Sequence, residues 1–171
     1  LLSIFAKGER PSGSSDPYAL RRAGNAVLQI LWHHGWTLDL GSLLADALAH
    51  WHQALPDLIV NREDLLADLA EFLRQRVVSL LEDQQIPVDL VQAVAGDGVP
   101  LERVLRDPAD ARWRAMVLLE CRQQDRLAAV QAVVTRAARL AVQADLPEGT
   151  LSPLGVIEDG LFASPSEAGM L

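Results

Sequence analysis

The amino-acid sequence predicts an all-α fold, organised as a helical bundle. Half of the 171 residues are hydrophobic, and the helix formers Ala, Leu, Arg, Gln and Glu dominate over the β-branched and aromatic residues that are typical of strands. Apolar residues recur at spacings of three and four, which is the pattern of a helix with one buried face. Capping residues and prolines divide the chain into segments of helical length.

The first long helix is predicted over residues 17–34. Asp16 precedes it as an N-cap, because its carboxylate can accept hydrogen bonds from the free amides of the first turn. Pro17 suits the first helical position, and Gly35 provides a left-handed stop. We expect the apolar residues at helical spacing to face the core, namely Leu20, Ala23, Val27, Ile30 and Leu31.

A second helix is predicted over residues 40–54, shortly before Pro56. Asn61 is then the predicted N-cap of a longer helix that reaches about residue 84, with an acidic residue three positions further on as in a capping box. Its apolar residues form one stripe that we expect to be buried, namely Leu65, Leu69, Phe72, Leu73, Val77, Leu80 and Leu81.

Further helices are predicted at residues 87–95, 100–106, 108–121 and 124–144. We expect the last two to pack as antiparallel neighbours. The last helix has an apolar stripe that we expect to face inward, namely Leu127, Val130, Val134, Ala137 and Ala141. Beyond Pro147 the chain is rich in Pro, Gly and Ser, which predicts a loop, and another helix is expected to start near Phe162.

Charge is distributed unevenly along the chain. The net charge of −8 argues against nucleic acid in general, but residues 106–140 carry seven basic and four acidic side chains. Guanidinium groups bind phosphate and stack on bases, so the arginines of this segment are candidate contacts for a polyanion. The candidates are Arg112, Arg114, Arg122, Arg126, Arg136 and Arg139. An ordinary solvated face, with ion pairs to the acidic residues between them, explains the same pattern, and both interpretations stay open.

No group of residues forms a recognisable catalytic or metal-binding pattern. Two pairs of histidines, at residues 33–34 and 50–52, lack the four-residue spacing that places two ligands on one helix face. Cys121 stands alone, which excludes an intrachain disulfide. The apolar start, Leu1 to Phe5, is too short to span a membrane. We therefore expect no catalytic residue, no metal, no cofactor and no membrane association in this chain.

The stretch from Gly8 to Ala23, which reads GERPSGSSDPYALRRA, resembles a family signature. The β subunit of bacterial heterotetrameric glycyl-tRNA synthetase typically reads G-x-x-P-T-G-S-x-D-P-F-A-L-R-R-A. Ser12 stands in place of Thr and Tyr18 in place of Phe. Weaker similarity to the same family continues at Phe72–Val77, Asp89–Val94, Arg112–Met116 and Thr135–Leu140.

The resemblance implies two domains of a longer protein, and the missing initiator Met also leads us to expect a fragment. Residues 1–60 are expected to be the end of an HD-like helical domain with its junction. Residues 61–171 are expected to form an anticodon-binding helical domain, like that of arginyl-tRNA synthetases, truncated at its C-terminal end.

The resemblance also implies a function. The chain is expected to be the tRNA-binding part of the β subunit of glycine–tRNA ligase, a cytoplasmic enzyme. It would recognise tRNA-Gly for aminoacylation carried out with the α subunit, where ATP and Mg²⁺ are used. The alternative is a helical protein-interaction module with no RNA role, whose acidic face over residues 61–102 meets a protein partner.

The expected tRNA contacts are Arg112, Arg114, Arg136 and Arg139. Arg21 and Arg22 match the family signature and are expected either to contact tRNA or to brace the domain junction by pairing with acidic side chains. We favour the bracing role. Positive charge near a helix N-terminus opposes the helix dipole, which indicates that another contact retains these two arginines there.

Overall fold

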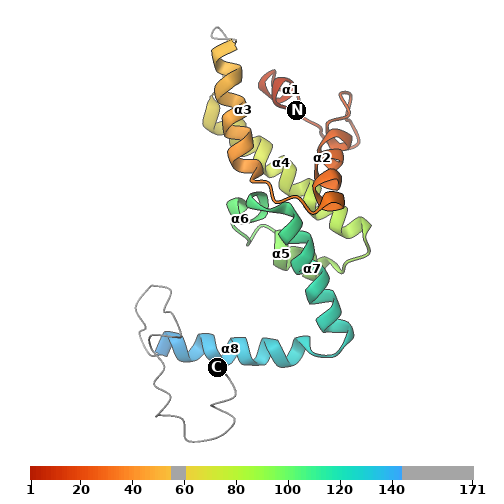
Figure 1. Ribbon diagram of the computed structural model, residues 1–171, viewed down its shortest axis with the longest axis vertical. Helices are drawn as coiled ribbons and strands as arrows, with labels where there is room; N and C mark the ends of the chain where they lie inside the picture. The colour runs from red at the N-terminus through yellow and green to blue at the C-terminus, as the bar shows by residue number, and fades with distance from the viewer. Residues whose placement is uncertain (55–60, 144–171) are drawn as a thin grey trace, which may run out of the picture. The chain divides into compact units, whose positions relative to one another are not determined.

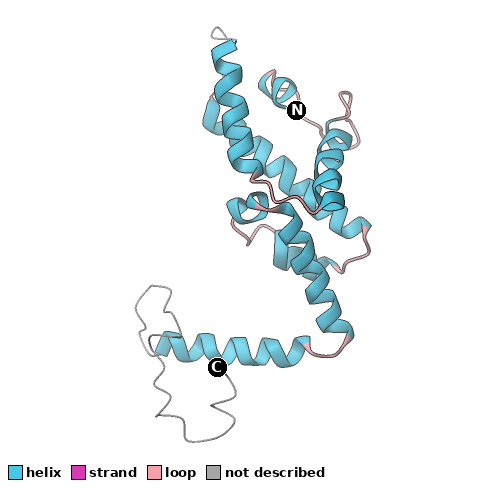
Figure 2. Ribbon diagram, viewed as in Figure 1, coloured by secondary structure: helices cyan, strands magenta, loops and turns pink. Residues whose placement is uncertain are grey.

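The computed structural model describes residues 1–54 and 61–143, apart from the side chain of His52. Within these residues the chain is all-α, as predicted, and no strand is present beyond an isolated bridge between Ser12 and Ser15 (Figure 2). The helices, labelled in Figure 1, are α1 (Leu2–Ala6), α2 (Leu20–His34), α3 (Leu40–Ala54), α4 (Arg62–Asp83), α5 (Val88–Ala95), α6 (Leu101–Arg106), α7 (Pro108–Gln123) and α8 (Leu127–Gln143). None of the described helices is long and apolar enough to cross a membrane.

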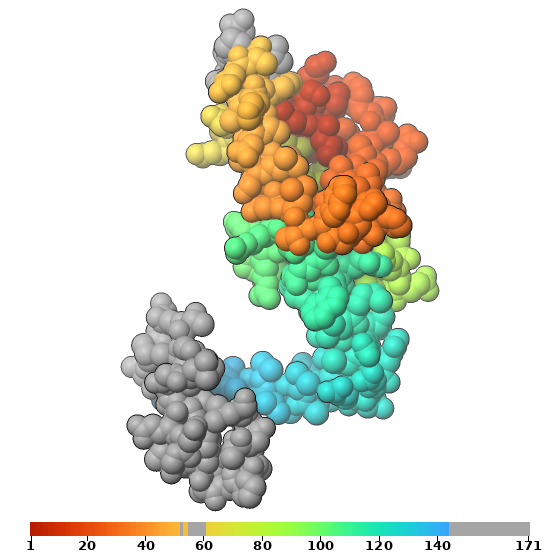
Figure 3. All heavy atoms as spheres, viewed as in Figure 1, coloured from red at the N-terminus to blue at the C-terminus, as the bar shows by residue number. Residues whose placement is uncertain are grey.

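The chain divides into two compact units, Leu1–Ala128 and Ala129–Leu171. In the first unit, α4 crosses behind α2 and α3 and contacts each of the other helices from α1 to α7 (Figure 1). The space-filling view shows the orange end of α2 and start of α3 lying against the green and teal segments (Figure 3), where α2 contacts α7 and α3 contacts α6. The predicted domain boundary near residue 60 concerns the longer protein and stays a prediction.

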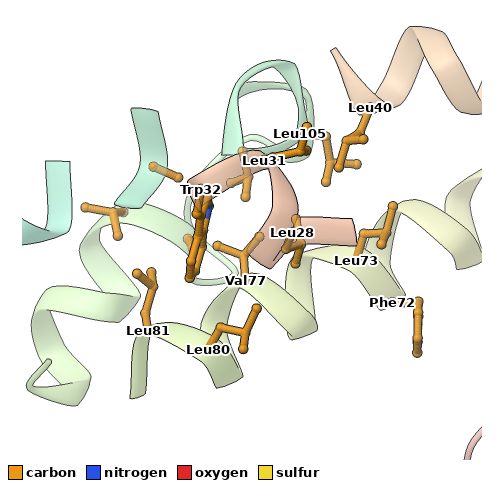
Figure 4. Packing of buried hydrophobic residues seen from close by; sticks show 14 of the residues in the cluster. Leu28, Leu31, Trp32, Leu40, Phe72, Leu73, Val77, Leu80, Leu81 and Leu105 are labelled. Carbon is orange, nitrogen blue, oxygen red and sulfur yellow. The ribbon is translucent and has the colours of Figure 1, made fainter. Parts of the chain in front are cut away.

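The long helix α4 supplies the centre of the core. Asn61 caps it as predicted, because its side-chain oxygen accepts hydrogen bonds from the amides of Glu63 at 3.1 Å and Asp64 at 3.4 Å. Every residue of its predicted apolar stripe is buried. Leu28 and Trp32 of α2 lie opposite Val77 of α4 in this core (Figure 4).

The start of α2 differs from the prediction. The helix begins at Leu20, not at Pro17, because Ala19 adopts a left-handed conformation with φ of 54°. Asp16 still provides the cap, but from outside the helix. Its two carboxylate oxygens accept hydrogen bonds from the amides of Leu20 at 2.7 Å and Arg21 at 3.1 Å. Asp16 therefore caps the helix as predicted, but the helix begins three residues later than predicted.

The buried face of α2 also differs from the prediction. Val27 and Ile30, both expected in the core, are exposed, and so is Ala23. Leu20 and Leu31 are buried as predicted, and the other buried residues are Gly24, Leu28 and Trp32. The helix is rotated because Gly24 lets α4 approach closely, and because the buried Trp32 donates its indole N–H to the carbonyl of Pro108 at 2.8 Å.

The expected inward face of α8 is not buried within the described residues. Leu127 is partly buried against the first core, whereas Val130 and Val134 are exposed. Ala137 and Ala141 are exposed as well. The predicted loop from Pro147 and the helix expected near Phe162 lie outside the described residues, and antiparallel packing of the last two helices stays a prediction.

Candidate nucleic-acid interface

Arg112 lies on α7 and is half-buried. Its guanidinium carbon lies 5.6 Å from the centre of the Trp32 ring, a distance at which a cation is attracted to an aromatic face. Its Nε donates a hydrogen bond to the side-chain oxygen of Gln84 at 3.1 Å. Arg112 therefore ties α7 to the end of α2 and to the residue that follows α4.

Arg114, two residues further along α7, is engaged in an ion pair. Its Nε donates to a carboxylate oxygen of Asp110 at 2.7 Å, one helical turn earlier. Only 19% of its side chain is exposed, and Nη2 is buried without a hydrogen-bond partner among the described residues. This is one of the ion pairs that the alternative interpretation, an ordinary solvated face, requires.

Arg136 and Arg139 lie three residues apart on α8, so they share a helix face. Both side chains are exposed, and neither forms an ion pair with another described residue. This pair belongs to the second unit, while Arg112 and Arg114 belong to the first. Among the four predicted contacts, the two on α8 present the most accessible guanidinium groups within the described residues.

The loop before α2 is closed by Arg21. Ser12 and Ser15 exchange backbone hydrogen bonds at 3.1 and 2.8 Å, around a turn in which Gly13 has a φ of 51°. Arg21 then donates to the carbonyl of Gly13 at 2.9 Å and to that of Ser15 at 3.4 Å. The partners of Arg21 are backbone carbonyls, in place of the acidic side chains that were expected, and Arg22 is exposed.

Another arginine joins the same loop to α4. Arg10 forms an ion pair with Asp68, and its guanidinium lies 5.7 Å from the centre of the Phe5 ring. Phe5 in turn packs edge-on against Phe72, with 5.2 Å between ring centres. The loop between α1 and α2, residues 7–19, is therefore held from both sides, by α2 and by α4.

Arg76 of α4 was missed by sequence reasoning. Its guanidinium lies 5.7 Å from the Phe72 ring, and its Nε is buried without a hydrogen-bond partner among the described residues. Burial lowers the pKa of Arg76, and the positive charge of Arg21 lowers it further. No local sequence pattern could have revealed that Arg76 lies near Arg21, because the packing of α2 on α4 brings the two side chains together.

Two ion-pair groups connect helices within the first unit. Arg74 of α4 pairs with Glu71 and with Asp97 in the turn after α5, and its hydrogen bond holds the pKa of the Glu71 carboxyl below its usual range. Arg122 of α7 pairs with Asp89 of α5 and lowers the pKa of that carboxyl. Of these ion pairs, only Glu71–Arg74 could be predicted from sequence, because the two residues are three positions apart on one helix.

No group of three or more His, Cys, Asp or Glu residues is arranged to hold a metal ion in the described part of the chain. His33, His34 and Trp36 instead form a row of aromatic rings at the end of α2. The rings of His34 and Trp36 are stacked with 4.8 Å between their centres. What the described surface offers is guanidinium groups and aromatic faces, which are groups that bind phosphates and bases.

Comparison with known proteins points to the same family as the sequence stretch from Gly8 to Ala23. The family model for the glycyl-tRNA synthetase beta subunit matches residues 1–96. Curated relatives named glycine–tRNA ligase beta subunit include those of Picosynechococcus sp. and Acaryochloris marina, each 43% identical over 169 residues. These alignments cover 98% of the chain and 23% of each relative. The protein of Haemophilus influenzae is 31% identical over 158 residues, which are 92% of the chain and 21% of that protein.

The chain thus spans less than a quarter of the length of the curated relatives it matches. The matched residues include the whole loop between α1 and α2 and the arginines Arg21 and Arg22 of α2, and extend through α5. Because the family model covers more than half of the sequence, the chain belongs to the glycyl-tRNA synthetase beta subunit family.

Proposed function

We propose that the chain is a tRNA-binding part of the β subunit of a glycine–tRNA ligase. In this proposal it contributes to the recognition of tRNA-Gly, and the α subunit carries out aminoacylation with ATP and Mg²⁺ in the cytoplasm. Support comes from family membership and from the names of the relatives. The chain's own task is binding, so no cofactor is assigned to it.

The observation that carries the proposal is the exposed pair Arg136 and Arg139 on one face of α8. A guanidinium group presents a planar fork of donors that matches phosphate oxygens, and RNA offers phosphates along its whole backbone. Two such groups one turn apart can contact neighbouring phosphates or one phosphate and a base edge. Their exposure means that no intramolecular ion pair with a described residue must be broken first.

The contacts of the other four predicted arginines suggest different roles in this proposal. Arg21 braces the junction through the loop carbonyls, and the exposed Arg22 beside it remains a candidate for tRNA contact. Arg114 is held by Asp110, which favours a supporting role over a direct phosphate contact. Arg112 is fixed in place by Trp32 and Gln84 and can contact RNA only with its terminal nitrogens.

The test uses the assembled ligase, with both subunits, carrying Arg136→Ala and Arg139→Ala together. We expect weaker binding of tRNA-Gly, and a plot of log K against log salt concentration that is less steep by about 1.5, because each lost phosphate contact removes roughly 0.7 to 0.9. Glycine activation with ATP should be unchanged. The control is Arg62→Ala with Arg106→Ala, which removes the same charge from exposed positions on α4 and α6.

An unchanged affinity and salt dependence in the α8 variant would contradict the proposal. The alternative, a helical module that binds protein through its acidic face, predicts that outcome. It also predicts that removing acidic residues from the exposed side of α4 weakens assembly of the two subunits, which sedimentation of the mixed subunits measures directly.

A further inference from the structure

A groove of about 580 Å³ lies between the end of α2 and the first turns of α7, inside the first unit. A ligand pocket typically has a volume of about 300 to 1,000 Å³, so the groove is large enough for a small planar group. The side chains that line it include Trp32, Asp107, Asp110, Arg112, Trp113 and Met116.

One wall of the groove is an accessible aromatic surface. Trp113 is 65% exposed and Met116, one turn further along α7, is 45% exposed. Trp32, by contrast, is buried and donates its indole N–H to Pro108. A large indole left open to solvent beside a thioether is a ready stacking platform, because its flat apolar face gains free energy when a planar group covers it.

The groove also contains oriented hydrogen-bond donors. The Arg112 guanidinium is held by a cation–π contact with the Trp32 ring and by the hydrogen bond that its Nε donates to the Gln84 oxygen. Its terminal nitrogens have no hydrogen-bond partner among the described residues. A guanidinium that is already fixed loses little conformational freedom when it donates to a ligand, which makes it an effective partner for a hydrogen-bond acceptor.

The two carboxylates of the groove are already engaged. Asp107 accepts hydrogen bonds from the amides of Ala109 at 3.0 Å and Asp110 at 3.1 Å, as the N-cap of α7. Asp110 accepts from Arg114. Since both negative charges have partners, the groove is better suited to a neutral planar group with acceptor atoms than to a cationic side chain.

We propose that this groove binds one unstacked nucleobase of the RNA. The base stacks on the exposed indole of Trp113, and the terminal nitrogens of Arg112 donate to acceptor atoms on its edge. Every nucleobase has a π face and ring or carbonyl acceptors, and single-stranded RNA exposes them. This inference rests on the proposed function, because it requires RNA as the partner.

The experiment measures tRNA-Gly binding by the assembled ligase carrying Trp113→Ala or Trp113→Phe. We expect the alanine variant to bind about 5- to 150-fold more weakly, the usual loss of one stacked base. The phenylalanine variant keeps a ring and should retain most of the affinity. The salt dependence should stay that of the wild type, because no phosphate contact is lost. The matched control is Leu43→Ala, which removes another exposed large apolar side chain, on α3, that does not line the groove.

A second measurement uses a set of tRNA-Gly molecules that each lack one base. For the base that occupies the groove, its removal and Trp113→Ala should not add, because both destroy the same contact. Additive losses at every position would overturn the proposal, as would wild-type affinity of Trp113→Ala or equal losses for Ala and Phe. Weaker association of the subunits in place of weaker tRNA binding would assign the groove to a protein partner.

The outcomes separate the two proposals. If the α8 variant loses affinity and Trp113→Ala does not, only the groove proposal fails. If neither variant changes tRNA binding, both proposals fail. Because Trp113 is largely exposed, its substitution should leave folding intact, and unchanged glycine activation by the ligase confirms that the assembly is correct.

Discussion

At the residue scale, Gly24 sets the distance between α2 and α4. A Cβ atom at this position would lie 3.0 Å from Cε1 of Phe72 and 3.1 Å from Cγ of Arg76. Phe72 cannot move away easily, because it is buried and packs edge-on against Phe5. Glycine is therefore required here by a close approach of two helices, even though it lowers the helix propensity of α2.

We predict that Gly24→Val lowers the free energy of unfolding of the chain by about 2 to 3 kcal/mol, because the added methyl groups overpack this contact. Urea denaturation followed by circular dichroism measures the change. The same side chain at the exposed Ala26 should change stability by less than about 0.5 kcal/mol. Equal effects at both positions would mean that β-branching in the helix, and not the contact with Phe72, is responsible.

At the scale of the elements, the helix ends are set by side chains that can lie outside the helix. Asp16 caps α2 across a turn, four residues ahead of the first capped amide. Asn61 caps α4 from the standard adjacent position. The two cases differ because Ala19 is left-handed, so that α2 begins only at Leu20 and the Asp16 carboxylate reaches forward to the amides of Leu20 and Arg21.

We predict that Asp16→Ala loosens the start of α2 by about 1 to 2 kcal/mol, the usual loss of a helix cap. Amide hydrogen exchange of Leu20 and Arg21 should accelerate, while exchange in α4 stays unchanged. Asp16→Asn keeps a hydrogen-bond acceptor and should show a smaller effect. Equal exchange rates in wild type and in the alanine variant would show that these two amides do not depend on Asp16.

At the scale of the first unit, ion pairs join helices that are distant in sequence. Arg74 joins α4 to the turn after α5, and Arg122 joins α7 to α5. Both carboxyl partners with a lowered pKa, Glu71 and Asp89, are more stable in their charged form when the chain is folded. A carboxyl of this kind stabilises the fold at any pH above its pKa in the unfolded chain, and the benefit is lost on acidification.

We predict that the free energy of unfolding is nearly constant above about pH 5 and falls as the pH drops below about 4, because the unfolded chain then takes up protons that the folded carboxyls, with their lowered pKa, resist. Glu71→Gln should lower stability at pH 7 and make the fall below pH 4 less steep. Urea midpoints between pH 3 and 7 measure both effects. The same acid dependence in the wild type and the Gln variant would show that Glu71 contributes nothing to it.

Much of the fold was predictable because its signals are local. The bounds of α3 and the cap and buried stripe of α4 agree with the prediction, since caps, prolines and helical periodicity act over a few residues. The candidate site was predictable only as a set of arginines. Which of them remain accessible depends on partners far away in sequence, as Trp32 and Gln84 are for Arg112.

The sequence by itself determined that the described part of this chain is helical, where most of its helices begin and end, and which family the stretch from Gly8 to Ala23 resembles. Only the tertiary structure decided that α2 buries Leu28 in place of Val27 and Ile30, because the three side chains are similarly apolar and the close contact at Gly24 selects between the two faces. It also decided that Arg112 and Trp113 border one groove. The buried face of α2 and the groove depend on contacts between segments that are distant in sequence, and local periodicity carries no information about such contacts.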